Sequence, residues 1–122
     1  MTKAIFFDID GTLVSFDTHQ IPASTVEAIA AAHARGIRMF IATGRAPGFI
    51  NNLGALQDRG LIDGYVTMNG GYCYVGDEVL HKQVIPAPEV KAILDYCEAH
   101  RITCTVVDEH HICACYPSAA LR

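Results

Sequence analysis

Runs of apolar residues alternate with polar segments along the chain in a pattern that predicts strands and helices in turn. Residues 4–8 (Ala-Ile-Phe-Phe-Asp) stay apolar until the final aspartate, and residues 37–42 form a second apolar run. Both are typical of strands buried on both faces of a parallel sheet. Between them, residues 21–35 carry apolar side chains at helical spacing, which predicts an amphipathic helix that Gly36 ends.

A strand, a helix and a second strand in this order indicate a right-handed parallel crossover, so the fold class expected is α/β. Ser24 and Glu27 have the spacing of a capping box at the start of the helix. Residues 47–59, which Pro47 opens and Gly60 closes, predict a second helix before a strand at residues 64–68.

The pattern of apolar and polar residues changes after the Asn69-Gly70-Gly71 turn. A Gly-Asp turn joins two short apolar runs in a pattern that predicts a hairpin, and from Pro86 a further helix should lead into two strands. We expect residues 1–82 to form the N-terminal part of a parallel-sheet core and residues 83–122 to begin a second α/β module. The expected segments are 72–75 and 78–80 for the hairpin, and 102–107 and 112–116 for the last strands.

Composition and charge narrow the choice of partners. The net charge is −4, from 13 acidic and 9 basic residues, and no basic run occurs. We therefore expect neither a nucleic acid nor a membrane as partner, and a small soluble ligand fits better. The N-terminus lacks the pattern of a secretory leader, and the five cysteines are odd in number. These features predict a cytoplasmic protein with reduced thiols.

Two carboxylates, Asp8 and Asp10, lie two residues apart at the carboxyl end of the first expected strand. Ligands of open α/β sheets bind beyond these strand ends, and the period of two aims both side chains toward one side. Such a pair suits a nucleophile with an adjacent proton donor. Taken alone, the pair is explained equally well as an ordinary Asp-Gly turn.

A second candidate segment, Thr43-Gly44-Arg45, follows the next expected strand and precedes a helix. Its hydroxyl and backbone N–H groups could bind phosphate oxygens. Arg45 could contact phosphate or pair with an acid, two readings of equal weight. Asn69 and Gly70 follow the third strand, where a plain turn is as good a reading as a substrate contact.

With the Asp8-x-Asp10-Gly11-Thr12 motif, the Thr43 segment and the Asn69-Gly70-Gly71 turn, the sequence resembles the haloacid dehalogenase (HAD) superfamily over essentially its whole length. The branch it is most similar to is that of sugar phosphatases with a large α/β cap, the Cof-type or IIB subfamily. The resemblance implies a Rossmann-like parallel sheet and a phosphatase acting on small phosphorylated metabolites such as sugar phosphates.

The resemblance also implies roles for individual residues. Asp8 would attack phosphorus to give an aspartyl phosphate, and Asp10 would protonate the leaving oxygen and then deprotonate the attacking water. Thr43 would hold the transferring phosphoryl group. Mg²⁺ would be bound by the Asp8 carboxylate and the Asp10 backbone carbonyl.

Two further motifs of the family, a lysine and an acidic metal-binding motif, are not found in the sequence. We therefore expect that the chain is truncated within its cap. By itself it can lack phosphatase activity. A phosphomutase and a non-catalytic fragment that binds phosphate or a partner stay open as alternatives. Because the family's later strands would flank the first strand, we also expect self-association through its open edge.

Overall fold

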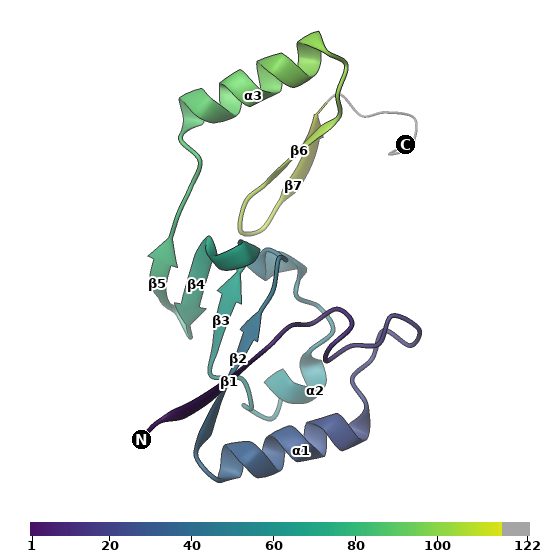
Figure 1. Ribbon diagram of the computed structural model, residues 1–122, viewed down its shortest axis with the longest axis vertical. Coiled ribbons are helices and arrows are strands. Elements are labelled where there is room, and N and C mark those ends of the chain that lie inside the picture. The colour runs from purple at the N-terminus through teal and green to yellow at the C-terminus, as the bar shows by residue number, and fades with distance from the viewer. Residues whose placement is uncertain (116–122) are drawn as a thin grey trace. The chain divides into compact units, whose positions relative to one another are not determined.

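The computed structural model describes residues 1–115 and divides the chain into two compact units, residues 1–82 and 83–122 (Figure 1). Each unit has its own secondary structure and is described by itself. The roles expected for them, a partial core and the start of a cap, stay predictions.

The first unit is built on a five-stranded sheet whose strands follow one another in chain order. The first three strands are parallel, and the last two join by antiparallel pairing. The α/β class and the hairpin predicted from the sequence are therefore confirmed. The strands are β1 (Lys3–Phe7), β2 (Ile37–Ala42), β3 (Gly64–Thr67), β4 (Tyr72–Val75) and β5 (Glu78–Lys82).

The crossover from β1 to β2 contains α1 (Ala23–Ala34). The helix was expected, but the capping box is wrong, because the N-cap is Pro22 and no side chain caps the helix. Glu27 accepts a hydrogen bond from Arg59 at 2.9 Å instead. Proline at this position supplies a fixed φ suited to helix entry.

The single helix predicted over residues 47–59 is wrong. The structure has a 3-10 turn, η1 (Pro47–Phe49), an irregular stretch, and a one-turn helix, α2 (Gly54–Gln57). Ile50 at the end of η1 is extended, with ψ of 101°. A second 3-10 turn, η2 (Met68–Gly70), connects β3 to β4.

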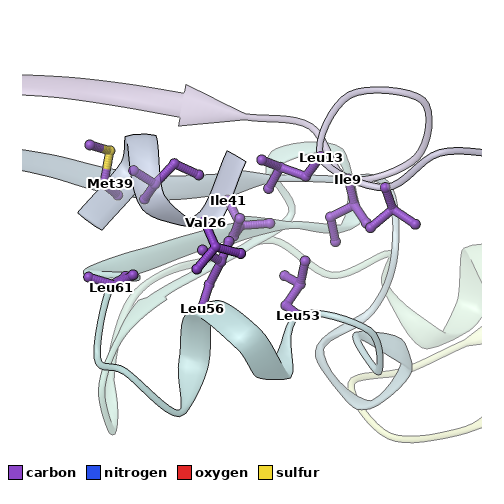
Figure 2. Packing of buried hydrophobic residues seen from close by; sticks show 10 residues of the cluster. Ile9, Leu13, Val26, Met39, Ile41, Leu53, Leu56 and Leu61 are labelled. Carbon is purple, nitrogen blue, oxygen red and sulfur yellow. The ribbon is translucent and has the colours of Figure 1, made fainter. Parts of the chain in front are cut away.

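One hydrophobic cluster fills the space between the sheet and the segments that cover it (Figure 2). Met39 and Ile41 of β2 meet Val26 of α1 and Leu56 of α2, so both helices pack against the same cluster. The loop after β1 joins it through Ile9, Leu13 and Val14, and Ile9 is 0% exposed. At about 25 cal/mol per Å² of apolar surface, burying such side chains fixes the loop firmly to the core.

The prediction that the first strand is buried on both faces is wrong for this chain. Four of the five β1 residues are exposed, and Phe6 keeps 57% of its surface accessible although its ring stacks on Phe40 at 4.8 Å. The reason is topological: β1 is the edge of the sheet formed by the described residues, so only β2 pairs with it.

The second unit contains α3 (Ala87–Ala99) and an antiparallel pair, β6 (Cys104–Val107) and β7 (Ile112–Cys115). Asp108 closes the turn between the strands, because its Oδ1 accepts hydrogen bonds from the N–H groups of His110 and His111. The last residue of the strand predicted to 116 lies outside the described residues. No helix in residues 1–115 has the length and apolar character to cross a bilayer.

Candidate active site

The Asp8 carboxylate lies immediately beyond the carboxyl end of β1 and is exposed to solvent. Its Oδ1 accepts a hydrogen bond from the N–H of Ile9 at 2.7 Å. The carbonyl of Ile9 in turn accepts N–H groups from the next turn, including those of Leu13 at 3.1 Å and Val14 at 3.0 Å. The backbone that follows Asp8 therefore forms a hydrogen-bonded turn that is anchored in the core, while the Asp8 carboxylate faces water.

Gly11 lets the chain turn sharply between the two acids and the residues that follow. Its φ is +77°, a conformation that side chains rarely adopt. An added Cβ would also lie 2.6 Å from Cε2 of Phe16. The Phe16 ring thus lies directly against the backbone of this turn while 71% of the residue stays exposed. Sequence reasoning missed Phe16, for which only an apolar residue in a polar loop gave a signal.

Asp10 and Arg45, which are 35 residues apart in the sequence, form a two-point ion pair. Arg45 donates from Nε to Asp10 Oδ2 at 3.0 Å and from Nη2 to Asp10 Oδ1 at 2.5 Å. This planar arrangement is the strong form of an arginine–carboxylate contact. Of the two sequence readings of Arg45, the structure has the pairing with an acid.

The remaining guanidinium nitrogen holds Arg45 to the irregular stretch between η1 and α2. Nη1 donates to the carbonyl of Phe49 at 3.2 Å and to the side-chain oxygens of Asn51 and Asn52 at 3.3 Å each. Sequence reasoning missed these partners because it placed them inside a helix. The adjacent asparagines, which favour turns, were the signal that could have found them.

Thr43 begins the loop after β2 and is buried. Its N–H bonds to the carbonyl of Val66 on β3 at 2.9 Å, and its Oγ1 accepts the N–H of Arg45 at 3.1 Å. The hydroxyl can still donate its own proton to a ligand oxygen. Thr43 therefore lies at the carboxyl end of β2, which pairs with β1, the strand that Asp8 follows.

Asn69 joins this loop from the turn after β3. Its N–H bonds to the Thr43 carbonyl at 3.2 Å, and its side-chain Oδ1 lies 3.1 Å from where a Cβ on Gly44 would stand. Asn69 has a positive φ of 54°, and Gly70 one of +93°. The Gly70 carbonyl accepts a hydrogen bond from the thiol of Cys73 on β4 at 3.5 Å. This bond joins Gly70 to the hairpin rather than to Asp8 or Asp10.

The oxygen atoms at Asp8 and Asp10 suit Mg²⁺, which prefers oxygen ligands and keeps several waters. Arg45 donates one hydrogen bond to each Asp10 carboxylate oxygen, so each oxygen keeps a lone pair that can take a proton. The Asp10 backbone carbonyl would then be its ligand to the metal, beside the exposed carboxylate of Asp8. Within residues 1–115, no group of three or more histidine, cysteine, aspartate or glutamate side chains could hold a metal. The residues therefore fit a partial set of ligands for Mg²⁺.

Comparison with known proteins identifies the family. Residues 5–118 match the model of the haloacid dehalogenase-like hydrolases, and the chain belongs to this family. The HAD-like subclass IIB sugar phosphatase BT4131 has a solved structure that is 60% identical, with a TM-score of 0.88 over 98% of this chain and 46% of its own. BT1666 from Bacteroides thetaiotaomicron, a phosphatase of the same superfamily, is 30% identical over 93% of this chain and 41% of its own, with a TM-score of 0.82.

The candidate phosphatase YkrA of Bacillus subtilis (strain 168) is 29% identical over 91% of this chain and 46% of its own length. The chain thus spans about half the length of the relatives it matches. The similarity to the HAD superfamily that the motifs indicated is confirmed.

Proposed function

We propose that this chain carries the catalytic nucleophile of a Mg²⁺-dependent phosphomonoesterase that acts on small phosphorylated metabolites, such as sugar phosphates. Asp8 is the nucleophile and Asp10 the acid/base. The observation that carries the proposal is the meeting of an exposed Asp8, an Asp10 fixed by Arg45, and Thr43 at the carboxyl ends of neighbouring parallel strands.

In the proposed reaction, an oxygen of Asp8 attacks phosphorus, and the bond from phosphorus to the leaving oxygen breaks. Asp10 gives a proton to that oxygen and then takes one from the water that attacks the aspartyl phosphate. Thr43 donates its hydroxyl hydrogen to a phosphoryl oxygen. Water as the final acceptor gives a phosphatase, whereas a sugar hydroxyl would give a phosphomutase.

Arg45 is a positioning residue in this scheme, because it acts through Asp10. Its two hydrogen bonds fix the Asp10 carboxylate, and its contacts with Phe49 and the asparagines fix Arg45 itself. When bound, Mg²⁺ neutralises the charge that would otherwise keep the Asp8 carboxylate from an anionic phosphate. The Asp8 carboxylate and the Asp10 carbonyl would hold it.

The solved structures that resemble this chain support the reaction class. One, from a phosphoryl-transfer superfamily described as conserving a trigonal-bipyramidal intermediate, is 61% identical with a TM-score of 0.86 over 97% of this chain and 45% of its own. BT4131 is described as a sugar phosphatase. We also propose a cytoplasmic location, in keeping with the free thiols of Cys73, Cys97, Cys104 and Cys113.

The test is phosphate release from a panel of sugar phosphates, with and without Mg²⁺, by the full chain, the Asp8→Asn variant and the Asp77→Asn variant. Asp77 is an exposed aspartate in the β4–β5 turn and serves as the matched control. We expect Mg²⁺-dependent release by the parent chain and Asp77→Asn, and none by Asp8→Asn. Equal release by all three would contradict the proposal, and binding of phosphate without release would favour the non-catalytic alternative.

A further inference from the structure

An exposed aromatic side chain, Phe16, lies beside the proposed acid/base. It keeps 71% of its surface exposed, more than any other large hydrophobic residue in residues 1–115 except the terminal Met1. One edge of its ring lies against Gly11, the residue that directly follows Asp10. Its Cε2 and Cζ atoms are 2.6 Å and 2.9 Å from where a Cβ on Gly11 would stand. The ring thus contacts the backbone of the candidate site, while most of its surface can still contact a ligand.

The backbone that carries Phe16 is held by hydrogen bonds and by the core. Val14, two residues earlier, is 2% exposed and belongs to the hydrophobic cluster. The Ser15 carbonyl accepts the N–H of His19 at 2.9 Å, and the Ser15 Oγ accepts the N–H of Asp17 at 3.1 Å. Phe16 therefore begins a hydrogen-bonded turn that is already folded before a ligand binds. Such preorganisation lowers the entropic cost of binding.

Asp10 has polar partners from one loop and an apolar neighbour from another. Arg45, from the loop after β2, donates to both carboxylate oxygens of Asp10. Phe16, from the loop after β1, lies against the next residue in the chain. In the proposed reaction Asp10 protonates the leaving oxygen, so the carbon skeleton attached to that oxygen lies close to Asp10. The skeleton that fits this setting has hydroxyl groups as well as an apolar surface.

The ring of a cyclic sugar has both properties. Its hydroxyl groups can bind polar groups, and its C–H bonds form a flat apolar face. Those C–H groups carry a small positive charge, which the negative face of an aromatic ring attracts. Binding sites commonly combine aromatic walls with a few polar groups in this way. An open-chain phosphate offers no flat face, and inorganic phosphate has no carbon skeleton.

We propose that Phe16 is a specificity-determining residue that contacts the leaving group and selects phosphate esters of cyclic sugars over open-chain phosphates. The inference rests on the proposed function, because it assumes that Asp8 and Asp10 receive the ester. Phe16 exchanges no proton and forms no bond. Its contribution is therefore to the affinity for the ester and not to the chemical step.

The test is an NMR titration of the full chain with Mg²⁺ present and with isotope-labelled phenylalanine rings. The ligands are glucose-6-phosphate, glycerol-3-phosphate and inorganic phosphate, and phosphorus signals from the same samples report any release of phosphate. Loss of a ring signal in Phe16→Leu or Phe16→Tyr assigns it to Phe16. We expect glucose-6-phosphate to shift this signal and to bind more tightly than the other two ligands by about 3-fold or more.

Two substitutions at Phe16 separate the aromatic ring from its apolar character. Phe16→Leu should weaken the binding of glucose-6-phosphate by about 3- to 10-fold and leave the binding of the other two ligands unchanged. Phe16→Tyr keeps the ring and should bind glucose-6-phosphate as the parent chain does. The matched control is Tyr96→Leu, at an exposed aromatic residue of α3, which should change none of the affinities. Circular dichroism checks that each variant is folded.

The titration distinguishes a failure of this inference from a failure of the proposed function. Equal affinity for the three ligands, or a Phe16 signal that glucose-6-phosphate does not shift, would overturn the role of Phe16 and leave the proposed function standing. Unchanged binding of glucose-6-phosphate by a folded Phe16→Leu would do the same. If no ligand binds and no phosphate is released, the proposed function is contradicted, and this inference with it.

Discussion

The contact between Arg45 and Asp10 makes the orientation of the proposed acid/base depend on a second residue. A lysine in place of Arg45 keeps the charge but cannot make two parallel hydrogen bonds, so Asp10 would gain rotational freedom. We expect Arg45→Lys to lower kcat for phosphate release by roughly 10²-fold, with a smaller change in KM, because misplacement of a catalytic group costs about that much.

The matched control is Arg59→Lys, because Arg59 pairs only with the exposed Glu27 among its described contacts. Its kinetics should equal those of the parent chain. Steady-state kinetics over a range of pH would distinguish a positioning role of Arg45 from a purely structural one, because a positioning role also changes the shape of the pH profile. An Arg45→Lys variant with unchanged kcat would show that the pair is structural only.

At this scale the sequence indicates the chemistry of single residues better than their partners. Asp8, Asp10 and Thr43 could be placed because each follows a recognisable strand, and parallel strands end at one edge of a sheet. Whether Arg45 meets phosphate or an acid depends on a distance across 35 residues, which no local pattern contains. The ring of Phe16 against Gly11 was hidden for the same reason.

Among elements, Asp63 ties together α1, β2 and β3 at the end of the sheet opposite to the acids. Its carboxylate accepts the N–H of Met39 at 2.8 Å and lies 3.2 Å from Nε2 of His33. Its own N–H bonds to the carbonyl of Met39 at 2.7 Å. The two elements on which the candidate site depends, β2 and β3, are thus joined by both backbone and side chain.

We therefore expect Asp63→Ala to lower the free energy of unfolding by about 1–3 kcal/mol, because it leaves a partly buried N–H without its partner. Asp77→Ala, at an exposed turn, should change it by less than about 0.5 kcal/mol. Urea denaturation followed by circular dichroism measures both. Equal midpoints for the two variants would contradict the role given to Asp63.

The strands β3 and β4 carry a cluster of three tyrosines, Tyr65, Tyr72 and Tyr74. The ring of Tyr74 stacks on Tyr65 at 4.9 Å and tilts against Tyr72 at 5.6 Å. Burial, and then the two neighbouring tyrosines, raise the pKa of Tyr74 to about 12. A raised pKa means that folding favours the neutral phenol. The contribution of Tyr74 to the free energy of unfolding is therefore fully present below about pH 10 and is lost as the pH rises toward 12.

Spectrophotometric titration of the tyrosines should therefore show one that ionises later than the others. Tyr74→Phe should remove that late step, and Tyr96→Phe, on the exposed side of α3, should leave it. A late step that persists in Tyr74→Phe would mean that another tyrosine is responsible.

The elements themselves were predicted with uneven success. Residues 37–42 and the hairpin have strong strand patterns and clear turns, and they form where expected. Residues 47–59 carry helix signals at both ends. The hydrogen bonds from Arg45 to the Phe49 carbonyl and to the two asparagines keep the middle of this segment out of a helix. Tertiary contacts of this kind override local propensity.

For the molecule as a whole, the open edge of β1 is the feature with the clearest consequence. Ile5 and Phe6 are 39% and 57% exposed on a strand that pairs on one side only within the described sheet. Exposed apolar edges recruit other strands, so we propose that the chain self-associates through β1.

Sedimentation velocity at micromolar concentration should reveal a species larger than the monomer, and Ile5→Lys should shift it toward the monomer. Ile93→Lys, at an exposed isoleucine on α3 outside the sheet, is the matched control and should not. A strictly monomeric parent chain would contradict the proposal.

The most direct test of the central claim is to locate the phosphoryl group itself. The full chain is incubated with a sugar phosphate and Mg²⁺, quenched in acid, and its peptides are mapped by mass spectrometry. We predict a phosphoryl group on Asp8 that is absent from Asp8→Asn and present in Asp77→Asn. A phosphoryl group on a different residue, or release of phosphate by Asp8→Asn at the parent rate, would contradict the account.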